Sequence, residues 1–202
     1  MACKSTLCTL LATNYNLDQC SIGNELRNLV SKNSTGHAAR IKCMLSVDEL
    51  VILAQNVKAG TLAPSTNTPK YIIERVFPEG AILNHVRILL DGFPRKVDRW
   101  EAFKEGVQEL WRPDDMTWVI VMDVDRNLAR QRFMSRGRAG DEFERRFDEH
   151  MENIGPIVAA MKNDGVNVIE YKSAPDYDAG AILKFFSGIP GWTERVGKGS
   201  RE

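Results

Sequence analysis

The sequence predicts an α/β fold built around a parallel β-sheet with helices on both faces. Two short apolar runs, Val86–Asp91 and Thr117–Asp123, have the length and branched composition of buried parallel strands, and Asn167–Tyr171 is a third. Segments with apolar residues at helical spacing lie between these runs. Strands that alternate with helices in this way are typical of a parallel sheet whose crossover helices cover it.

Helices are also predicted ahead of the first of these strands. Three leucines near the start recur at helical spacing: Leu7, Leu10 and Leu11. A short helix is expected from Asn24 to Val30, and residues 36–60 are expected to be helical and amphipathic. The polar segment 61–69 contains two prolines and predicts a loop. We expect this region to form an insert beside the sheet.

The second half predicts two longer helices and a loose tail. The first has an apolar stripe made by Trp100, Phe103, Val107 and Leu110. The other, with a bend expected at Gly155–Pro156, has a face made by Phe143, Phe147, Met151, Ile154, Val158 and Met161. From Ser187 the chain is rich in glycine and charge around a single Trp192, so we expect it to be loose.

Composition restricts the partners and the compartment. The length of 202 residues predicts one domain, and the 27 basic and 27 acidic side chains cancel, so neither nucleic acid nor an anionic membrane is an expected partner. Four cysteines match no zinc or disulfide pattern, which favours the reducing cytoplasm. No secretory signal or membrane-spanning run is evident, and we expect a monomer that acts on small molecules. His37, His85 and His150 are scattered and are interpreted as surface or core residues.

The strongest motif follows the first predicted strand. The segment Leu90–Arg95 reads Leu-Asp-Gly-Phe-Pro-Arg. Ligands of parallel α/β sheets bind beyond the carboxyl ends of the strands, so Asp91 and Arg95 are expected in such a crevice. The alternative is a plain turn with a surface arginine.

A cluster of arginines follows the second strand. Between Lys104 and Lys162 every basic side chain except His150 is an arginine: Arg112, Arg126, Arg130, Arg132, Arg136, Arg138, Arg145 and Arg146. A planar guanidinium binds phosphate oxygens with two donors at once, whereas an ammonium group acts as a point charge. The pattern therefore favours phosphate binding. The alternative is a solvated pair of helices in which these arginines form salt bridges with Asp141, Glu142 and Glu144.

Together these motifs resemble the nucleoside monophosphate kinases of the adenylate and uridylate/cytidylate kinase family. Residues 20–27 are similar to the family's Ser-Thr-Gly-Asp-x-Leu-Arg segment, and Gly60–Pro64 to its Gly-x-Leu-Val-Pro turn. The motifs occur in the family's order and span roughly residues 3–186. The resemblance implies a three-layer P-loop kinase fold, a monophosphate-binding insert at about 21–75, and a short lid without zinc at about 134–144.

The resemblance also implies site residues, with Mg²⁺ as cofactor and with ATP and a nucleoside monophosphate as substrates. For catalysis it implies Lys4, Arg132, Arg138 and Arg146. For the monophosphate it implies Ser21, Gly23, Arg27, Gly92, Arg95 and Arg99. For ATP it implies Lys4, Ser5, Thr6, Arg132 and Arg136, and for the metal Ser5 and Asp91.

Two departures from the family leave the activity open. Only Cys3–Thr6 matches the end of the phosphate-binding loop G-x-x-x-x-G-K-[ST], and the strand before it, which is central in this fold, is missing. Its loss would leave two separated strand pairs, so we expect a natural product that starts upstream. In adenylate kinases a glutamine recognises the base where this chain has Arg99, which leaves AMP, UMP and CMP open as acceptors.

Two other functions are therefore compatible with the sequence. One is a catalytically inactive relative that binds nucleotide or a protein partner. The other is a phosphate-loop kinase of a small metabolite, which fits less well because of the motifs around Arg27 and Gly60.

Overall fold

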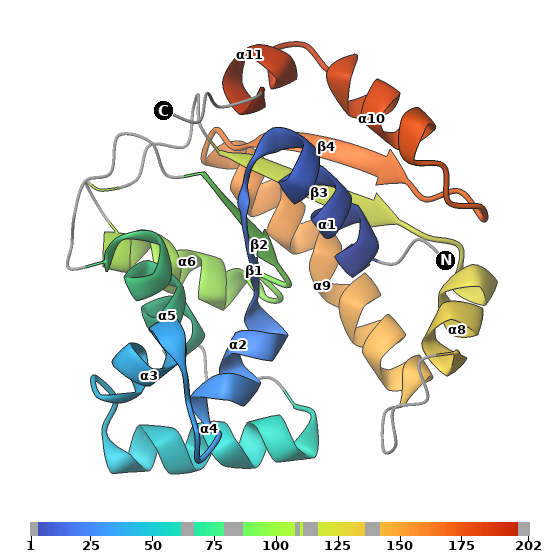
Figure 1. The fold of residues 1–202 in the computed structure, drawn as a ribbon. Coiled ribbons are helices and arrows are strands. Elements are labelled where there is room, and N and C mark those ends of the chain that lie inside the picture. Colours follow the sequence, from blue (N-terminus) through green and yellow to red (C-terminus); the bar gives the residue numbers. More distant parts are fainter. Residues whose placement is uncertain are drawn as a thin grey trace.

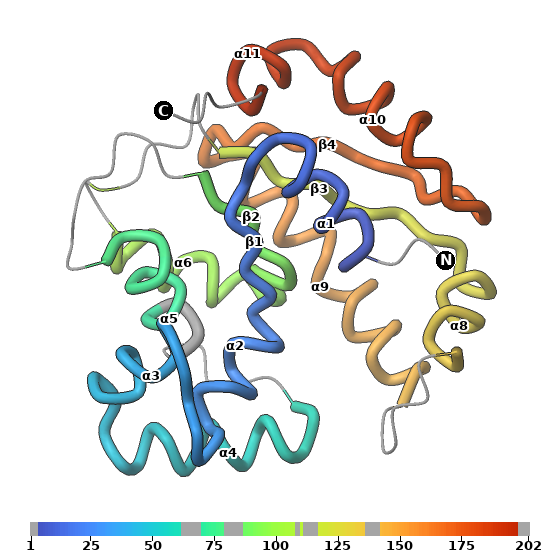
Figure 2. Tube along the Cα trace, in the orientation of Figure 1, coloured from blue at the N-terminus to red at the C-terminus, as the bar shows by residue number. Residues whose placement is uncertain are grey.

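The computed structural model describes residues 4–61, 67–78, 87–107, 110, 117–135 and 142–197. Figures 1 and 2 show how its elements are arranged. In chain order they are α1 (Lys4–Tyr15), β1 (Asp18–Ser21), α2 (Ile22–Leu29), α3 (Gly36–Lys42), α4 (Val47–Ala59), α5 (Asn67–Val76), β2 (Ile88–Asp91), α6 (Val97–Val107), β3 (Trp118–Asp123), α8 (Arg126–Met134), α9 (Phe143–Asn163), β4 (Asn167–Lys172), α10 (Ala179–Ser187) and α11 (Trp192–Val196).

The strands form two parallel pairs. β1 pairs with β2 in a register that sets Ser21 opposite Asp91, and β3 pairs with β4 in a register that sets Trp118 opposite Asn167. Within the described residues the two pairs are separate sheets: β2 is hydrogen-bonded only to β1, and β3 only to β4. This confirms the predicted α/β class with parallel strands, and it also confirms that the strands stand as two separated pairs.

Helices cover both faces of the strands, because alternate strand residues point to opposite sides. Leu89 and Ile120 pack into a cluster with α1, α10 and Trp192. Their neighbours Leu90 and Val119 pack into a second cluster with α2 to α6 and α9. The architecture is therefore helix, strand, helix in three layers (Figure 1).

The helices between β1 and β2 gather at one end of the molecule (Figure 1). The side chain of Ser46 accepts from the amide of Glu49, and the Glu49 carboxylate accepts from the amide of Ser46, which starts α4 with a capping box. Gly60 ends that helix in the left-handed conformation, with a φ of 66°. Tyr71 of α5 donates a hydrogen bond of 2.6 Å to the carboxylate of Glu25 on α2, which ties the group together.

Some elements differ from the predictions. The strand Asp18–Ser21 was not expected, because its sequence Asp-Gln-Cys-Ser has a single apolar residue, Cys20, which is fully buried. The helical character predicted over 36–60 is confirmed, but it is divided between α3 and α4, because the chain breaks between Lys42 and Val47 to place the Ser46 cap. Residues 67–76 form a helix where a loop was predicted through residue 69.

The carboxyl-terminal part is more ordered than its composition suggested. The loose tail predicted from Ser187 is wrong as far as residue 197, because Trp192 is 2% exposed and starts α11. Arg87 donates to the carbonyls of Val196 and Gly197 and so fixes the end of that helix. α9 runs continuously through Pro156, although Met151 on its predicted apolar face is exposed. No helix in the described ranges is both long and apolar enough to cross a membrane.

Candidate phosphate-binding cleft

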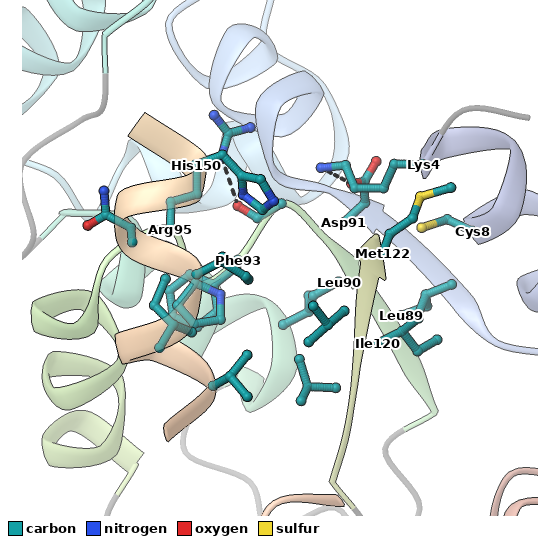
Figure 3. Close-up of a pocket in the computed structure, with 18 of the residues that line it drawn as sticks. Lys4, Cys8, Leu89, Leu90, Asp91, Phe93, Arg95, Ile120, Met122 and His150 are labelled. Carbon is teal, nitrogen blue, oxygen red and sulfur yellow. Dashed lines mark hydrogen bonds and ion pairs between the residues drawn. The ribbon is translucent and has the colours of Figure 1, made fainter. Parts of the chain in front are cut away.

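One large cavity, of about 950 Å³, lies between the two strand pairs. It is lined along its length by both inner strands, Ile88–Asp91 of β2 and Trp118–Met122 of β3. Figure 3 shows that the polar side chains gather at the end where Asp91 lies, while leucine and isoleucine side chains line the remainder. The cavity thus has a charged end, at the carboxyl ends of the strands, and an apolar end.

An ion pair between Asp91 and Lys4 marks the charged end. Asp91 is the last residue of β2 and is 7% exposed, and Nζ of Lys4 lies 2.5 Å from its Oδ1. Lys4 is the first residue of α1 and is half exposed, so its ammonium group remains open to a ligand. A buried carboxylate beside a reachable ammonium group can orient that ammonium toward an anion, or it can itself bind a divalent cation.

Gly92 makes the sharp turn that brings Arg95 back to this end. Its φ of 97° lies in the region that favours glycine, and a Cβ there would lie 3.4 Å from both Lys4 Nζ and Arg95 Nη2. Nε of Arg95 donates a bond of 3.3 Å to the carbonyl of Gly92. The turn therefore brings the cationic ends of Lys4 and Arg95 close to one backbone position.

Positive charges accumulate around Arg95. Solvent reaches its side chain, although many protein atoms surround it. This burial lowers the pKa of Arg95, and repulsion from Arg146 and Arg27 lowers it further. Attraction to Asp91 and Glu149 offsets the decrease only in part. Arginine nevertheless stays protonated at neutral pH, so its charge is held in the cleft against burial and repulsion. An anion bound at this point would reduce the repulsion.

α9 contributes a face that the sequence analysis did not identify. Arg146, Glu149, His150 and Asn153 are spaced at one helix face and all line the cavity. Figure 3 shows His150 next to Arg95. Burial, then the positive charges of Lys4 and Arg95, lower the pKa of His150. The side chain of His150 is exposed, in agreement with its interpretation as a surface or core residue, and the 146, 149, 150, 153 spacing is the signal that could have placed it on this face.

The other arginines of the cluster divide into two groups. Arg126 pairs with Glu144 and lies 3.3 Å from Asp148, Arg130 pairs with Glu144 at 3.7 Å, and Arg145 with Glu142 at 3.3 Å, all on the exposed surface. For these three the salt-bridge alternative is confirmed. Arg132 differs, because it lines the cavity and is 5% exposed.

Arg132 is held by the loop that follows β4. Its Nη1 donates to Oγ of Ser173 at 2.9 Å and its Nη2 to the carbonyl of Ala174 at 2.7 Å, while no partner for its buried Nε is present among the described residues. This guanidinium thus fixes the loop beside the cavity. Its phosphate contact stays a prediction.

The remaining predicted residues either do not line the cavity or lie outside the described part of the chain. Ser21 and Gly23 lie at the start of α2. Arg27 lies in its last turn, where its Nη2 donates to Asn24 Oδ1 at 2.5 Å. Arg99 of α6 is buried, which lowers its pKa. Ser5 and Thr6 occupy the first turn of α1 but are not among the described residues that line the cavity. Arg136 and Arg138 lie outside the described residues.

The charged end fits magnesium only in company with a ligand. Asp91 offers one buried carboxylate there, and no group of three or more acidic, histidine or cysteine side chains among the described residues could hold a metal alone. Mg²⁺ in nucleotide sites is typically held by one or two carboxylates together with phosphate oxygens. The residues present fit that arrangement.

Comparison with known proteins agrees with these features. No protein-family model matches the chain. It is 24% identical over 198 residues to a UMP-CMP kinase of Lentinula edodes, covering 92% of this chain and 82% of the relative. It is 24% identical over 168 residues to a uridylate kinase of Saccharomyces cerevisiae, covering 83% and 71%, and 27% identical over 126 residues to an adenylate kinase of Corynebacterium diphtheriae, covering 61% and 67%. The parallel α/β fold and these similarities support the resemblance of the chain to the nucleoside monophosphate kinases, which include the adenylate and UMP-CMP kinases.

Proposed function

We propose that the chain is an ATP-dependent nucleoside monophosphate kinase that transfers the γ-phosphoryl group of ATP to AMP, UMP or CMP. The observation that carries the proposal is the convergence of Lys4, Arg95 and Arg146 around Asp91 at the carboxyl ends of the strands. These residues come from three elements far apart in the sequence. Names of the relatives support the reaction class without selecting the acceptor.

The proposed chemistry depends on positioning and charge neutralisation. In phosphoryl transfer the charge spreads over the oxygens of the moving group, and catalysis consists mainly of holding donor and acceptor in line. Lys4 and Arg146 would neutralise the transferred group, and Arg27 and Arg95 would hold the acceptor phosphate. When bound, Mg²⁺ would neutralise the donor phosphates, and Asp91 is the residue that would hold it.

The segments around the cleft would exclude water from the reaction. Water competes with the monophosphate as acceptor, so a kinase of this type needs to cover its bound substrates. We propose residues 21–75 as the monophosphate-binding insert and about 134–144 as the lid, with Arg136 and Arg138 acting from it on the ATP phosphates. The enzyme is further proposed to act as a cytoplasmic monomer.

A second candidate is a nucleotide-binding relative without turnover. It is favoured by the donors of Arg132, which are engaged with Ser173 and Ala174 rather than directed to a ligand. In this case the cleft would bind nucleotide and the chain would act through a partner.

The test is coupled turnover with ATP and each of AMP, UMP and CMP, paired with nucleotide binding by calorimetry. Arg146→Gln should lower kcat by at least about 100-fold, because it removes charge stabilisation from the transferred group. Arg145→Gln is the matched control, because Arg145 is adjacent in sequence but pairs with Glu142 on the surface. Binding with no diphosphate formed from any acceptor would select the second candidate, and absence of both binding and turnover would reject both candidates.

A further inference from the structure

Two residues of α5 that lie one turn apart hold the unit formed by β1 and α2. Oη of Tyr71 donates a hydrogen bond of 2.6 Å to Oε2 of Glu25 on α2, and Arg75 forms an ion pair with Asp18, the first residue of β1. Tyr71 is 1% exposed. Burial raises the pKa of its hydroxyl, and the hydrogen bond to Glu25 raises it further, so the group stays protonated and donates at neutral pH. α5 therefore holds this unit at two points.

The contact with Glu25 fixes how α2 is turned about its axis. α2 has eight residues, and its N-cap Ser21 makes no side-chain capping hydrogen bond to the described residues. A helix this short depends on tertiary contacts. Because each residue turns an α-helix by about 100°, Gly23 and Arg27 lie together on the side roughly opposite Glu25. In agreement, a Cβ on Gly23 would lie 3.6 Å from Nη1 of Arg27. A rotation of α2 would therefore move Arg27.

The opposite side of α5 is fixed against α6, the helix that follows the Arg95 turn. α5 packs along α6 (Figure 1), and Gly106 permits a close approach, since a Cβ there would lie 2.2 Å from Cδ1 of Ile73. Burial and then Arg146 lower the pKa of Arg95, and the charge of Arg27 adds to this decrease. The guanidinium groups of Arg27 and Arg95 thus lie within electrostatic reach of each other. α5 is the element that relates one to the other.

We propose that Tyr71 is a positioning residue of the acceptor site, a role that presupposes the kinase function proposed above. Its bond to Glu25 sets the rotation of α2 and so holds Arg27 where it and Arg95 bind one phosphate of the nucleoside monophosphate. Tyr71 acts through Glu25 without touching the substrate. Two apolar side chains could fill this contact, but a hydrogen bond also fixes its direction.

The test is the KM for each substrate in Tyr71→Phe, which removes the hydroxyl and keeps the ring. KM for the acceptor should rise roughly 10-fold, as expected for the loss of a hydrogen bond to a charged group, while KM for ATP stays unchanged. A general loss of stability would not separate the two constants. Tyr15→Phe is the matched control, because Tyr15 is also buried but packs against Trp192 in the other core cluster. It should leave both constants unchanged.

Two substitutions of Glu25 separate the hydrogen bond from the charge. Glu25→Gln keeps an oxygen that can accept from Tyr71, so it should keep the KM of the parent protein. Glu25→Ala removes the acceptor and should reproduce the effect of Tyr71→Phe. The double variant should be no worse than either single variant, because both remove the same contact. Chemical denaturation verifies that each variant folds.

Hydrogen exchange in residues 22–29 shows whether α2 itself responds, and exchange should become faster in Tyr71→Phe but not in Tyr15→Phe. Calorimetric Kd values replace KM if the parent protein binds monophosphate without turnover. An unchanged constant for the acceptor, equal rises for acceptor and ATP, or unchanged exchange in α2 would overturn the positioning role and leave the kinase function intact. If the parent protein neither binds nor phosphorylates AMP, UMP or CMP, the kinase function is wrong and this role falls with it.

Discussion

At the scale of single residues, Gly92 is the position on which the charged end most depends. Gly92→Ala forces an L side chain into a φ of 97° and sets a methyl group 3.4 Å from Lys4 Nζ and Arg95 Nη2. We expect a loss of about 1–2 kcal/mol in the free energy of unfolding, together with weaker nucleotide binding. Chemical denaturation and calorimetry measure the two effects.

Gly155 offers the control for that substitution. It lies within α9, and a methyl group added there would meet no atom of the described residues within 4 Å, so Gly155→Ala should stabilise the chain by up to about 1 kcal/mol. If both alanine variants behaved alike, the special role of the Gly92 turn would be wrong.

His150 reports the electrostatics of the cleft. Burial and the charges of Lys4 and Arg95 lower its pKa, so the folded state takes up this proton less readily than the unfolded chain. This contribution therefore destabilises the fold as the pH falls through the ordinary histidine range. An anion in the cleft should reduce the repulsion and raise the pKa of His150.

The prediction for His150 is measured by NMR titration with and without ATP. Arg95→Gln should also raise the pKa of His150 in the ligand-free protein, because it removes one repelling charge. An unchanged titration curve in both experiments would show that His150 does not sense the phosphate site.

Sequence patterns identified some of these residues and missed others for a physical reason. Asp91 and Arg95 were predictable because a strand end and a glycine turn define their positions locally. The division between Arg145, which pairs on the surface, and Arg146, which lines the cavity, depends on how α8 packs against α9. No pattern along the chain contains that packing.

At the scale of elements, the long apolar strands and helices were predictable and the short polar ones were not. β3 and α6 carry enough apolar residues to show their period. β1 has four residues and owes its strand conformation to pairing with β2, which is a tertiary contact. The break between α3 and α4 did have a local signal, because Ser46 and Glu49 form a capping box.

The packing of α6 against the end of α9 should depend on pH through Asp164. Trp100 Nε1 donates to its carboxylate at 2.7 Å, and Lys104 Nζ lies 2.8 Å from it. Burial would raise the pKa of Asp164, but these hydrogen bonds outweigh burial and lower it. The stabilisation is therefore complete above the unfolded pKa of about 3.9 and is lost as the pH falls through the lower folded value.

Asp164→Asn tests this interaction. It should reduce the free energy of unfolding at pH 7 by about 1–2 kcal/mol, and the difference from the parent protein should shrink toward pH 3. Denaturation at a series of pH values measures it, with Asp176→Asn at an exposed position as the control. A difference that stays constant with pH would rule out the charged hydrogen bonds as its cause.

At the scale of the whole molecule, one cavity lies between two separate strand pairs and ends at a group of like charges. The family resemblance predicted the order of the elements and the separation of the strand pairs, and the fold agrees with both. The size of the cavity and its division into a charged and an apolar end depend on how all layers pack, so they could be known only from the structure.

The charged end should therefore make global stability depend on anions. Because Arg95 is repelled by Arg146 and Arg27, a polyphosphate that binds the folded cleft relieves this repulsion and stabilises the fold. Pyrophosphate at about 100 times its Kd should contribute about 2.7 kcal/mol, which corresponds to a rise in Tm of roughly 5–10 °C for a chain of this size.

Sodium chloride at equal ionic strength should not reproduce the rise. Scanning calorimetry should find it abolished by Arg95→Gln and retained by Arg145→Gln, since Arg145 pairs with Glu142 away from the cavity. Equal stabilisation of both variants would mean that pyrophosphate binds elsewhere, and the three guanidinium groups would then not form one phosphate site.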